Sequence, residues 1–84
     1  MNMNSIQKFS EAHPDMKFIV EMYVIGSAEQ FGEDCRFEIA TNQKEEANFA
    51  TQYQEKGFKL VDANHFGSMR GDVSACMMVF KKKR

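Results

Sequence analysis

The sequence has few of the features that mark specialised protein classes. Its two cysteines, Cys35 and Cys76, stand in no metal-binding or redox spacing. No apolar run approaches about 18 residues, so we expect no membrane-spanning segment. The first five residues lack the basic stretch and apolar stretch that together begin a secretory signal. These absences predict one reduced, cytoplasmic domain over residues 1–84, located in a host cytoplasm if the gene belongs to a phage.

Charge is unevenly distributed, although the formal net charge is only −1. Four of the eleven basic residues close the chain, and they are Lys81, Lys82, Lys83 and Arg84. The rest of the chain therefore holds seven basic and twelve acidic side chains, which argues against a broad basic face for nucleic acid. We interpret residues 81–84 as a solubilising tail that keeps a strand end in water, with contact to phosphate groups as the alternative.

Secondary-structure signals divide the first half of the chain. Residues 1–16 form an N-terminal segment with a short helix, which Asn4 or Ser5 can cap and which Pro14 ends. Residues 17–25 are rich in β-branched and aromatic side chains and place apolar residues at every second position, which predicts a strand. A loop over 26–33 and a strand over 34–40 would complete an antiparallel hairpin.

The second half predicts a helix and a second hairpin. Asn42 and Glu45 fit a capping box for a helix over 43–56, and Gly57 fits its left-handed end. Strands follow at 58–66 and 73–82, joined by a turn at 67–72. The last strand is apolar on both faces, as is typical of a central strand. We therefore expect an α+β fold with a four-stranded antiparallel sheet and two helices, in the order α-β-β-α-β-β.

This expected fold carries the main functional prediction. Two short helices can cover only one face of four strands, so the other face would be an exposed apolar patch that binds a protein or a second copy of the chain. The residues expected to contact the partner combine this face with the following acidic loop: Ile19, Tyr23, Ile25, Glu29, Glu33, Asp34 and Val61.

Catalytic and metal-binding signals are weak, so we expect no enzyme, no cofactor and no metal site. His65 could face Cys76 across the second hairpin, which leaves a small enzyme with a Cys–His pair as a third hypothesis. No third orienting group is evident in the sequence, and a buried cysteine is usually inert.

Two segments resemble a family of small bacterial and phage domains of unknown function. The similarity lies in Gly57, Phe58, Leu60, Val61 and, at the end of the last strand, Phe80 and Lys81. It implies the order of elements and no activity. Together with the acidic body, it suggests a phage or mobile-element inhibitor of a host defence complex, similar to anti-CRISPR proteins. A nucleic-acid-binding module that uses Lys81, Lys82, Lys83 and Arg84 is the alternative.

Overall fold

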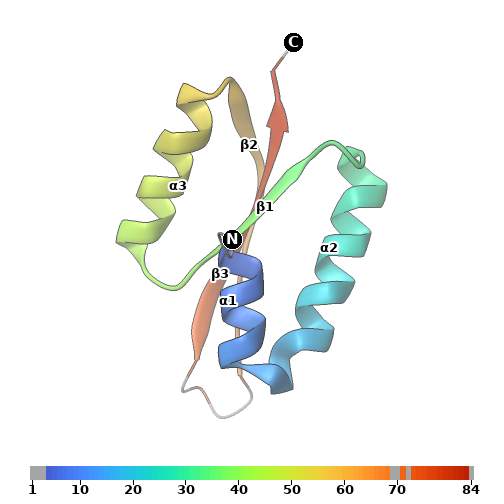
Figure 1. Cartoon of the computed structure of the whole chain (residues 1–84), viewed down its shortest axis with the longest axis vertical. Coiled ribbons are helices and arrows are strands. Elements are labelled where there is room, and N and C mark those ends of the chain that lie inside the picture. The colour runs from blue at the N-terminus through green and yellow to red at the C-terminus, as the bar shows by residue number, and fades with distance from the viewer. Residues whose placement is uncertain (1–3, 69–70, 72, 84) are drawn as a thin grey trace.

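The computed structural model describes residues 4–68, 71 and 73–83, which form three layers (Figure 1). The described elements follow in the order α1 (Ser5–Ala12), the 3₁₀ turn η1 (Pro14–Met16), α2 (Lys17–Phe31), β1 (Arg36–Ala40), α3 (Gln43–Glu55), β2 (Phe58–Gly67) and β3 (Ser74–Lys82). The strands form one antiparallel sheet in the order β1-β3-β2. Helices α1 and α2 lie on one side of this sheet and α3 lies on the other.

The prediction of a four-stranded sheet with two helices is wrong. Residues 17–25, expected as a strand, begin helix α2, and the loop expected over 26–33 is mostly its continuation to Phe31. The segment is apolar on all sides, so its residues fit a period of two and a helical period equally well. Pro14 does end α1 as predicted, but it also begins the 3₁₀ turn that leads directly into α2.

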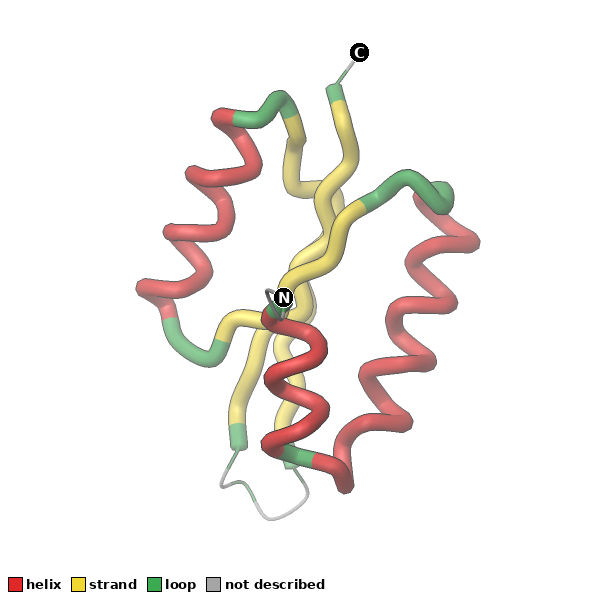
Figure 2. Tube along the Cα trace, viewed as in Figure 1, coloured by secondary structure: helices red, strands yellow, loops and turns green. Residues whose placement is uncertain are grey.

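The central strand was predicted correctly. All six residues from Ala75 to Phe80 are buried, and β3 pairs with β1 on one side and β2 on the other. Alternate side chains face opposite layers: Ala75, Met77 and Val79 pack with α1 and α2, whereas Cys76, Met78 and Phe80 pack with α3. Figure 2 shows the strands enclosed between the two helical layers.

Both faces of the described sheet are therefore covered by helices, and the prediction of an exposed sheet face is wrong. Misassignment of α2 caused this error, because a third helix was counted as a strand. The strand expected over 34–40 begins at Arg36, and the turn expected over 67–72 includes positions 69, 70 and 72, which lie outside the described residues.

Helix α3 starts and ends as its sequence predicts. The Asn42 side chain accepts a hydrogen bond from the Glu45 N–H at 2.8 Å. Gly57 has φ +86°, the left-handed conformation that favours glycine, and the next residue returns as β2. Tyr53 then stacks on Phe80 with ring centroids 4.2 Å apart, and it meets Phe58 edge-on at 5.6 Å. These contacts fix α3 on the sheet.

Glu38, on edge strand β1, links the two helical layers. Its carboxylate accepts hydrogen bonds from the Ser5 hydroxyl at the start of α1 and from the Tyr53 hydroxyl of α3. The Ser5 oxygen also accepts from the Ile39 N–H at 2.9 Å. Burial, and then the bonded Glu38, raise the pKa of Tyr53 well above its ordinary value. The phenol is thus held as a neutral donor to the carboxylate.

Candidate functional site: the outer face of α2

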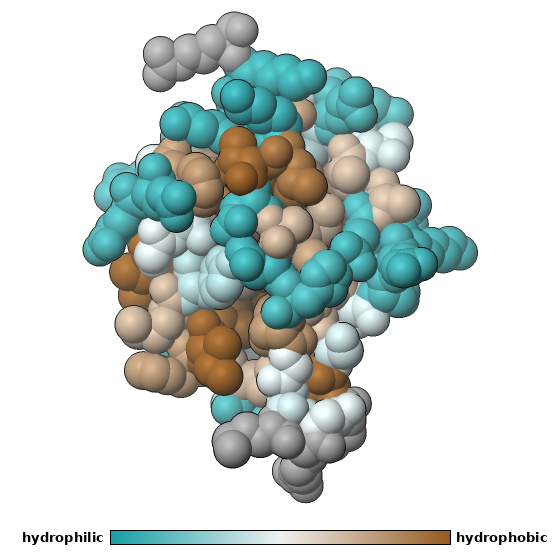
Figure 3. All heavy atoms as spheres, turned by 180° about the vertical axis from the view of Figure 1, so that it is seen from behind, coloured by the Kyte–Doolittle hydropathy of each residue, from teal (hydrophilic) through white to brown (hydrophobic). Residues whose placement is uncertain are grey.

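Helix α2 presents large apolar side chains to solvent on the side away from the sheet. Phe18 is 71% exposed, Met22 54% and Ile25 54%, and their spacing of four and three residues aligns them along one face. Ile19, at 49%, widens this stripe. We call Phe18, Ile19, Met22 and Ile25 the α2 stripe. Seen from behind, the edge of the molecule where α2 lies carries brown and tan side chains (Figure 3).

The opposite face of the same helix is in the core. Val20 is 1% exposed and Ser27 is 5% exposed, and seven residues, or two helical turns, separate them. A surface helix normally carries polar residues on the face that does not pack against its own core. Helix α2 instead carries four of the five large apolar side chains that are exposed among the described residues; the fifth is Leu60 on β2.

The predicted partner-binding residues separate into three groups. Ile19 and Ile25 belong to the α2 stripe, and Glu29, Glu33 and Asp34 are exposed at and after the end of the helix. Tyr23 and Val61 instead pack against the core. The Tyr23 hydroxyl donates to Asp62 at 3.4 Å, and burial, followed by the negative Asp62, raises the pKa of this tyrosine.

Phe18 and Met22 are the binding-site candidates that the sequence interpretation missed. A strand would have placed both on its core face, together with Val20. Reading the segment at a helical period of 3.6 would have aligned Phe18, Met22 and Ile25 on one face, opposite Val20. The signal was therefore present, but it required the correct element type.

A shallow groove adjoins the α2 stripe between α1 and α2, with a volume of about 410 Å³. Ile25 belongs to both features, and the floor of the groove includes Val20 and Val24. Ile6 and Ser10 form the α1 side. The apolar surface thus continues from the outer face of α2 into this depression.

The predicted basic tail is partly a strand end. Lys81 and Lys82 belong to β3, where Lys59 and Phe58 of β2 are their respective partners, and Lys83 donates its N–H to the Gly57 carbonyl at 2.8 Å. Arg84 lies outside the described residues. Like charges thus oppose each other at the Lys59–Lys81 pair.

An acidic side chain, Asp34, shares this end of the sheet. Cys35 lies close to both Asp34 and Lys81: burial raises the pKa of its thiol, Asp34 adds to the increase, and Lys81 opposes it. The basic end therefore has an acidic neighbour, which lowers its local positive charge.

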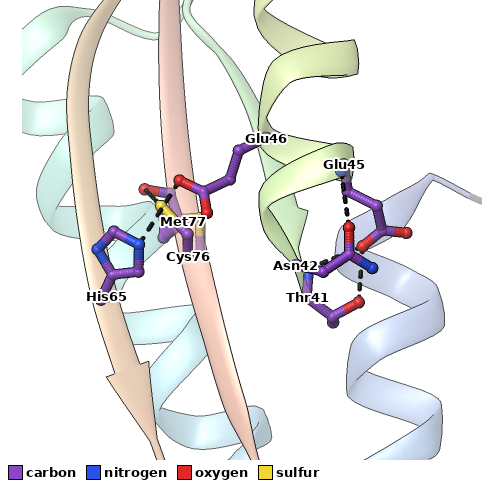
Figure 4. A network of polar contacts seen from close by, with 7 residues as sticks. All are labelled: Thr41, Asn42, Glu45, Glu46, His65, Cys76 and Met77. Atoms are coloured by element: carbon purple, nitrogen blue, oxygen red, sulfur yellow. Dashed lines mark hydrogen bonds and ion pairs between the residues drawn. The ribbon is translucent and has the colours of Figure 1, made fainter.

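A polar cluster on the α3 side joins three residues that are distant in sequence. His65 and Cys76 are direct partners across the β2–β3 ladder, as the sequence interpretation anticipated. Glu46, from the first turn of α3, places a carboxylate oxygen 3.5 Å from His65 Nε2 (Figure 4). The structure thus supplies a third group that the sequence did not reveal.

The cluster is poorly suited to nucleophilic catalysis. Cys76 is 1% exposed, and burial, followed by the neighbouring Glu46 carboxylate, raises its pKa to about 11. A nucleophilic cysteine needs the opposite shift, because the thiolate is the reactive form.

Within the described residues, no helix has the length and apolar character needed to cross a membrane. The described fold places the chain in the class of small α+β domains with three helices and a three-stranded antiparallel sheet. No family model, curated protein or solved structure matches the chain. The resemblance to a phage and bacterial family therefore stays a prediction.

Proposed function

We propose that this protein is a non-enzymatic protein-binding domain and that it binds through the outer face of α2. The observation that carries the proposal is the α2 stripe, which places four large apolar side chains in solvent along one helix. Exposed apolar side chains gathered in one patch mark interaction surfaces, whereas isolated ones are ordinary.

The size of the patch is suited to pairing with a second copy. An aromatic side chain buries roughly 150–250 Å² when covered; with the lower end of that range for the aliphatic side chains, the four, which are about half exposed, offer on the order of 400 Å². Two copies would bury about 800 Å² from these residues alone, and the flanking charged side chains bring the total near the ~1,000 Å² expected of a biological interface. A two-fold arrangement uses the same patch twice.

Charges along α2 favour an antiparallel pairing. Lys17 is the first residue of the helix and Glu29 lies near its last turn, so each sits at the helix end whose partial charge has the same sign as its own. In an antiparallel pair, Lys17 of one copy lies toward the carboxyl end of the other helix, where Glu29 is located. Among the described residues of one chain, Lys17 pairs with Glu21 at 3.9 Å, and this exposed ion pair contributes little.

Sedimentation equilibrium over a range of protein concentrations tests this proposal. We expect a dimer in the wild-type protein, and at least a tenfold rise in the dissociation constant for Phe18→Glu or Met22→Glu, because each buries a charge in the interface. Gln52→Glu is the matched control, since it adds the same charge to an exposed position on α3 and should leave the dimer intact.

A charge exchange tests the orientation. Lys17→Glu should weaken the dimer, and adding Glu29→Lys to the same chain should restore it, because the opposite charges are again adjacent. A wild-type protein that remains monomeric would exclude the second copy as partner. A protein partner of the α2 stripe should bind both the wild type and the Gln52→Glu variant, and it should fail to bind Phe18→Glu. If the wild type is monomeric and no such protein exists, the proposal itself is refuted.

The defence-inhibitor hypothesis is a narrower form of this proposal, in which the partner is a host protein that normally binds nucleic acid. Exposed Glu29, Glu33 and Asp34 adjoin the α2 stripe, so a basic protein surface would complement this edge. Binding of that kind should weaken with added salt and with Glu33→Lys, in addition to its loss in Phe18→Glu.

Nucleic-acid binding is a second candidate function, and the Lys59–Lys81 pair favours it. Two like charges directly opposite each other destabilise a ladder unless an anion joins them. Fluorescence anisotropy of a labelled oligonucleotide at several salt concentrations measures the affinity for nucleic acid. Loss of one phosphate contact in Lys59→Glu should reduce the slope of log K against log salt by about 0.7–0.9. Binding that is absent at low salt would exclude this candidate.

A further inference from the structure

We propose that Glu46, His65 and Cys76 form a binding site for a divalent transition-metal ion of the zinc type. Each residue offers one ligand atom, and the carboxylate oxygen, the imidazole nitrogen and the sulfur all lie within 4.8 Å of one another. Sulfur, nitrogen and oxygen ligands from cysteine, histidine and acidic residues are the set that zinc uses in proteins. This inference does not depend on the proposed function, because the cluster lies on the α3 side of the sheet and the α2 stripe does not.

Regular elements hold the backbones of all three ligands. Cys76 and His65 are opposite each other in an antiparallel ladder, so their side chains project from the same face at a fixed separation. Glu46 is in the first turn of α3, where its N–H donates to the Asn42 carbonyl at 3.1 Å. The capping interactions at Asn42 thus also hold the Glu46 backbone above the hairpin (Figure 4).

Small side-chain movements would complete the geometry. Zinc bonds of about 2.0–2.3 Å place tetrahedral ligands roughly 3.3–3.8 Å apart, and the His65–Glu46 pair is already at 3.5 Å. The His65 side chain is 68% exposed, so its ring can move toward the sulfur without disturbing the core. Cys76, which is buried, is the fixed point of the site.

The surroundings provide both charge balance and a fourth position. The Cys76 thiolate and the Glu46 carboxylate together carry two negative charges. A divalent ion neutralises both, so the ion and its ligands would have no net charge. The three residues line a pocket of about 220 Å³ whose other walls include Thr41, Asn42 and Ser74. Water or another small ligand can reach an ion from this side, which gives three protein ligands and one open position.

Cobalt(II) is the probe for this site, because cobalt bound to a thiolate gives a charge-transfer absorption that unbound cobalt lacks. Titration of the reduced full-length protein should give this band with one equivalent of Co²⁺, and Zn²⁺ should abolish it by displacement, since zinc competes well for such ligands. We expect His65→Ala and Glu46→Gln each to weaken Co²⁺ binding at least tenfold, and Cys76→Ala to eliminate the band.

The chain contains a matched control for each of two ligands. Cys35→Ala removes the other buried cysteine and His13→Ala the other histidine, and both should retain the wild-type titration. Because Cys76→Ala and Cys35→Ala both alter the core, circular dichroism must accompany each of them, whereas the exposed His65 can be changed without loss of fold. Absence of the band in the wild-type protein would overturn the inference, as would a band that His65→Ala leaves unchanged or that a folded Cys35→Ala variant lacks.

Discussion

At the scale of single residues, the start of α3 shows how local interactions can be anticipated. Asn42 caps the helix as a capping box predicts, but the Glu45 carboxylate reaches one residue further back than expected. It accepts from the Thr41 N–H at 2.7 Å and from the Thr41 hydroxyl at 2.6 Å. Residues three or four apart determine such a cap, so its location was readable from sequence. The choice of Thr41 depends on how β1 enters the helix, which sequence does not reveal.

Glu45→Gln tests this cap. The Thr41 hydrogen bonds lower the pKa of Glu45 from its ordinary value of 4.5, so ionised Glu45 stabilises the fold at pH values above 4.5 and this contribution disappears as the pH falls through the lower folded-state pKa. We expect Glu45→Gln to reduce the free energy of unfolding by about 0.5–1 kcal/mol at neutral pH and by less at about pH 3. Urea unfolding at both pH values measures this loss of stability.

The control is Glu55→Gln, which removes an exposed charge at the other end of α3 and should change the free energy of unfolding by less than about 0.5 kcal/mol. A loss in Glu45→Gln that does not depend on pH would contradict the role of the ionised carboxylate.

At the scale of elements, α2 shows where sequence interpretation fails. Residues 17–25 are apolar at nearly every position, so periodicity alone does not choose between a strand and a helix. β-branched and aromatic residues favour a strand, yet the segment forms the first part of a 15-residue helix. Packing beside α1 and over the sheet decides the outcome, and those contacts join distant parts of the chain. By contrast, β3 was predictable because six consecutive apolar residues suit a central strand.

Alanine substitutions on the two faces of α2 should differ in cost. Val20→Ala removes two buried methyl groups and should reduce the free energy of unfolding by about 2 kcal/mol, because Val20 is 1% exposed. Ile25→Ala removes more atoms but from an exposed side chain, so the loss should stay within about 0.5 kcal/mol. Urea denaturation at a protein concentration low enough to keep the chain monomeric provides the comparison. Equal losses at the two positions would contradict the assignment of Val20 to the buried face of α2 and of Ile25 to its exposed face.

At the scale of the whole molecule, the candidate sites depend on the arrangement of layers. The expectation that His65 faces Cys76 needed only one hairpin and could be made from sequence. Glu46 joins them because α3 crosses that hairpin at a particular angle, and no spacing in the sequence indicates this. Similarly, the predicted exposed sheet face was wrong, and the exposed apolar side chains lie instead on helix α2. A surplus of apolar residues is a property of composition, whereas its location is a property of the fold.

Coupling between folding and self-association provides the last prediction. If the α2 stripe pairs two copies, the dimer is the more stable species, and mass action makes stability depend on protein concentration. The melting temperature of the wild-type protein should then rise by several degrees for each tenfold increase in concentration above the dissociation constant. Differential scanning calorimetry of Phe18→Glu should show this rise only at protein concentrations at least tenfold higher, because its dimer is weaker by at least that factor. Gln52→Glu should behave like the wild type. A wild-type melting temperature that does not depend on protein concentration would show that the α2 stripe does not mediate self-association.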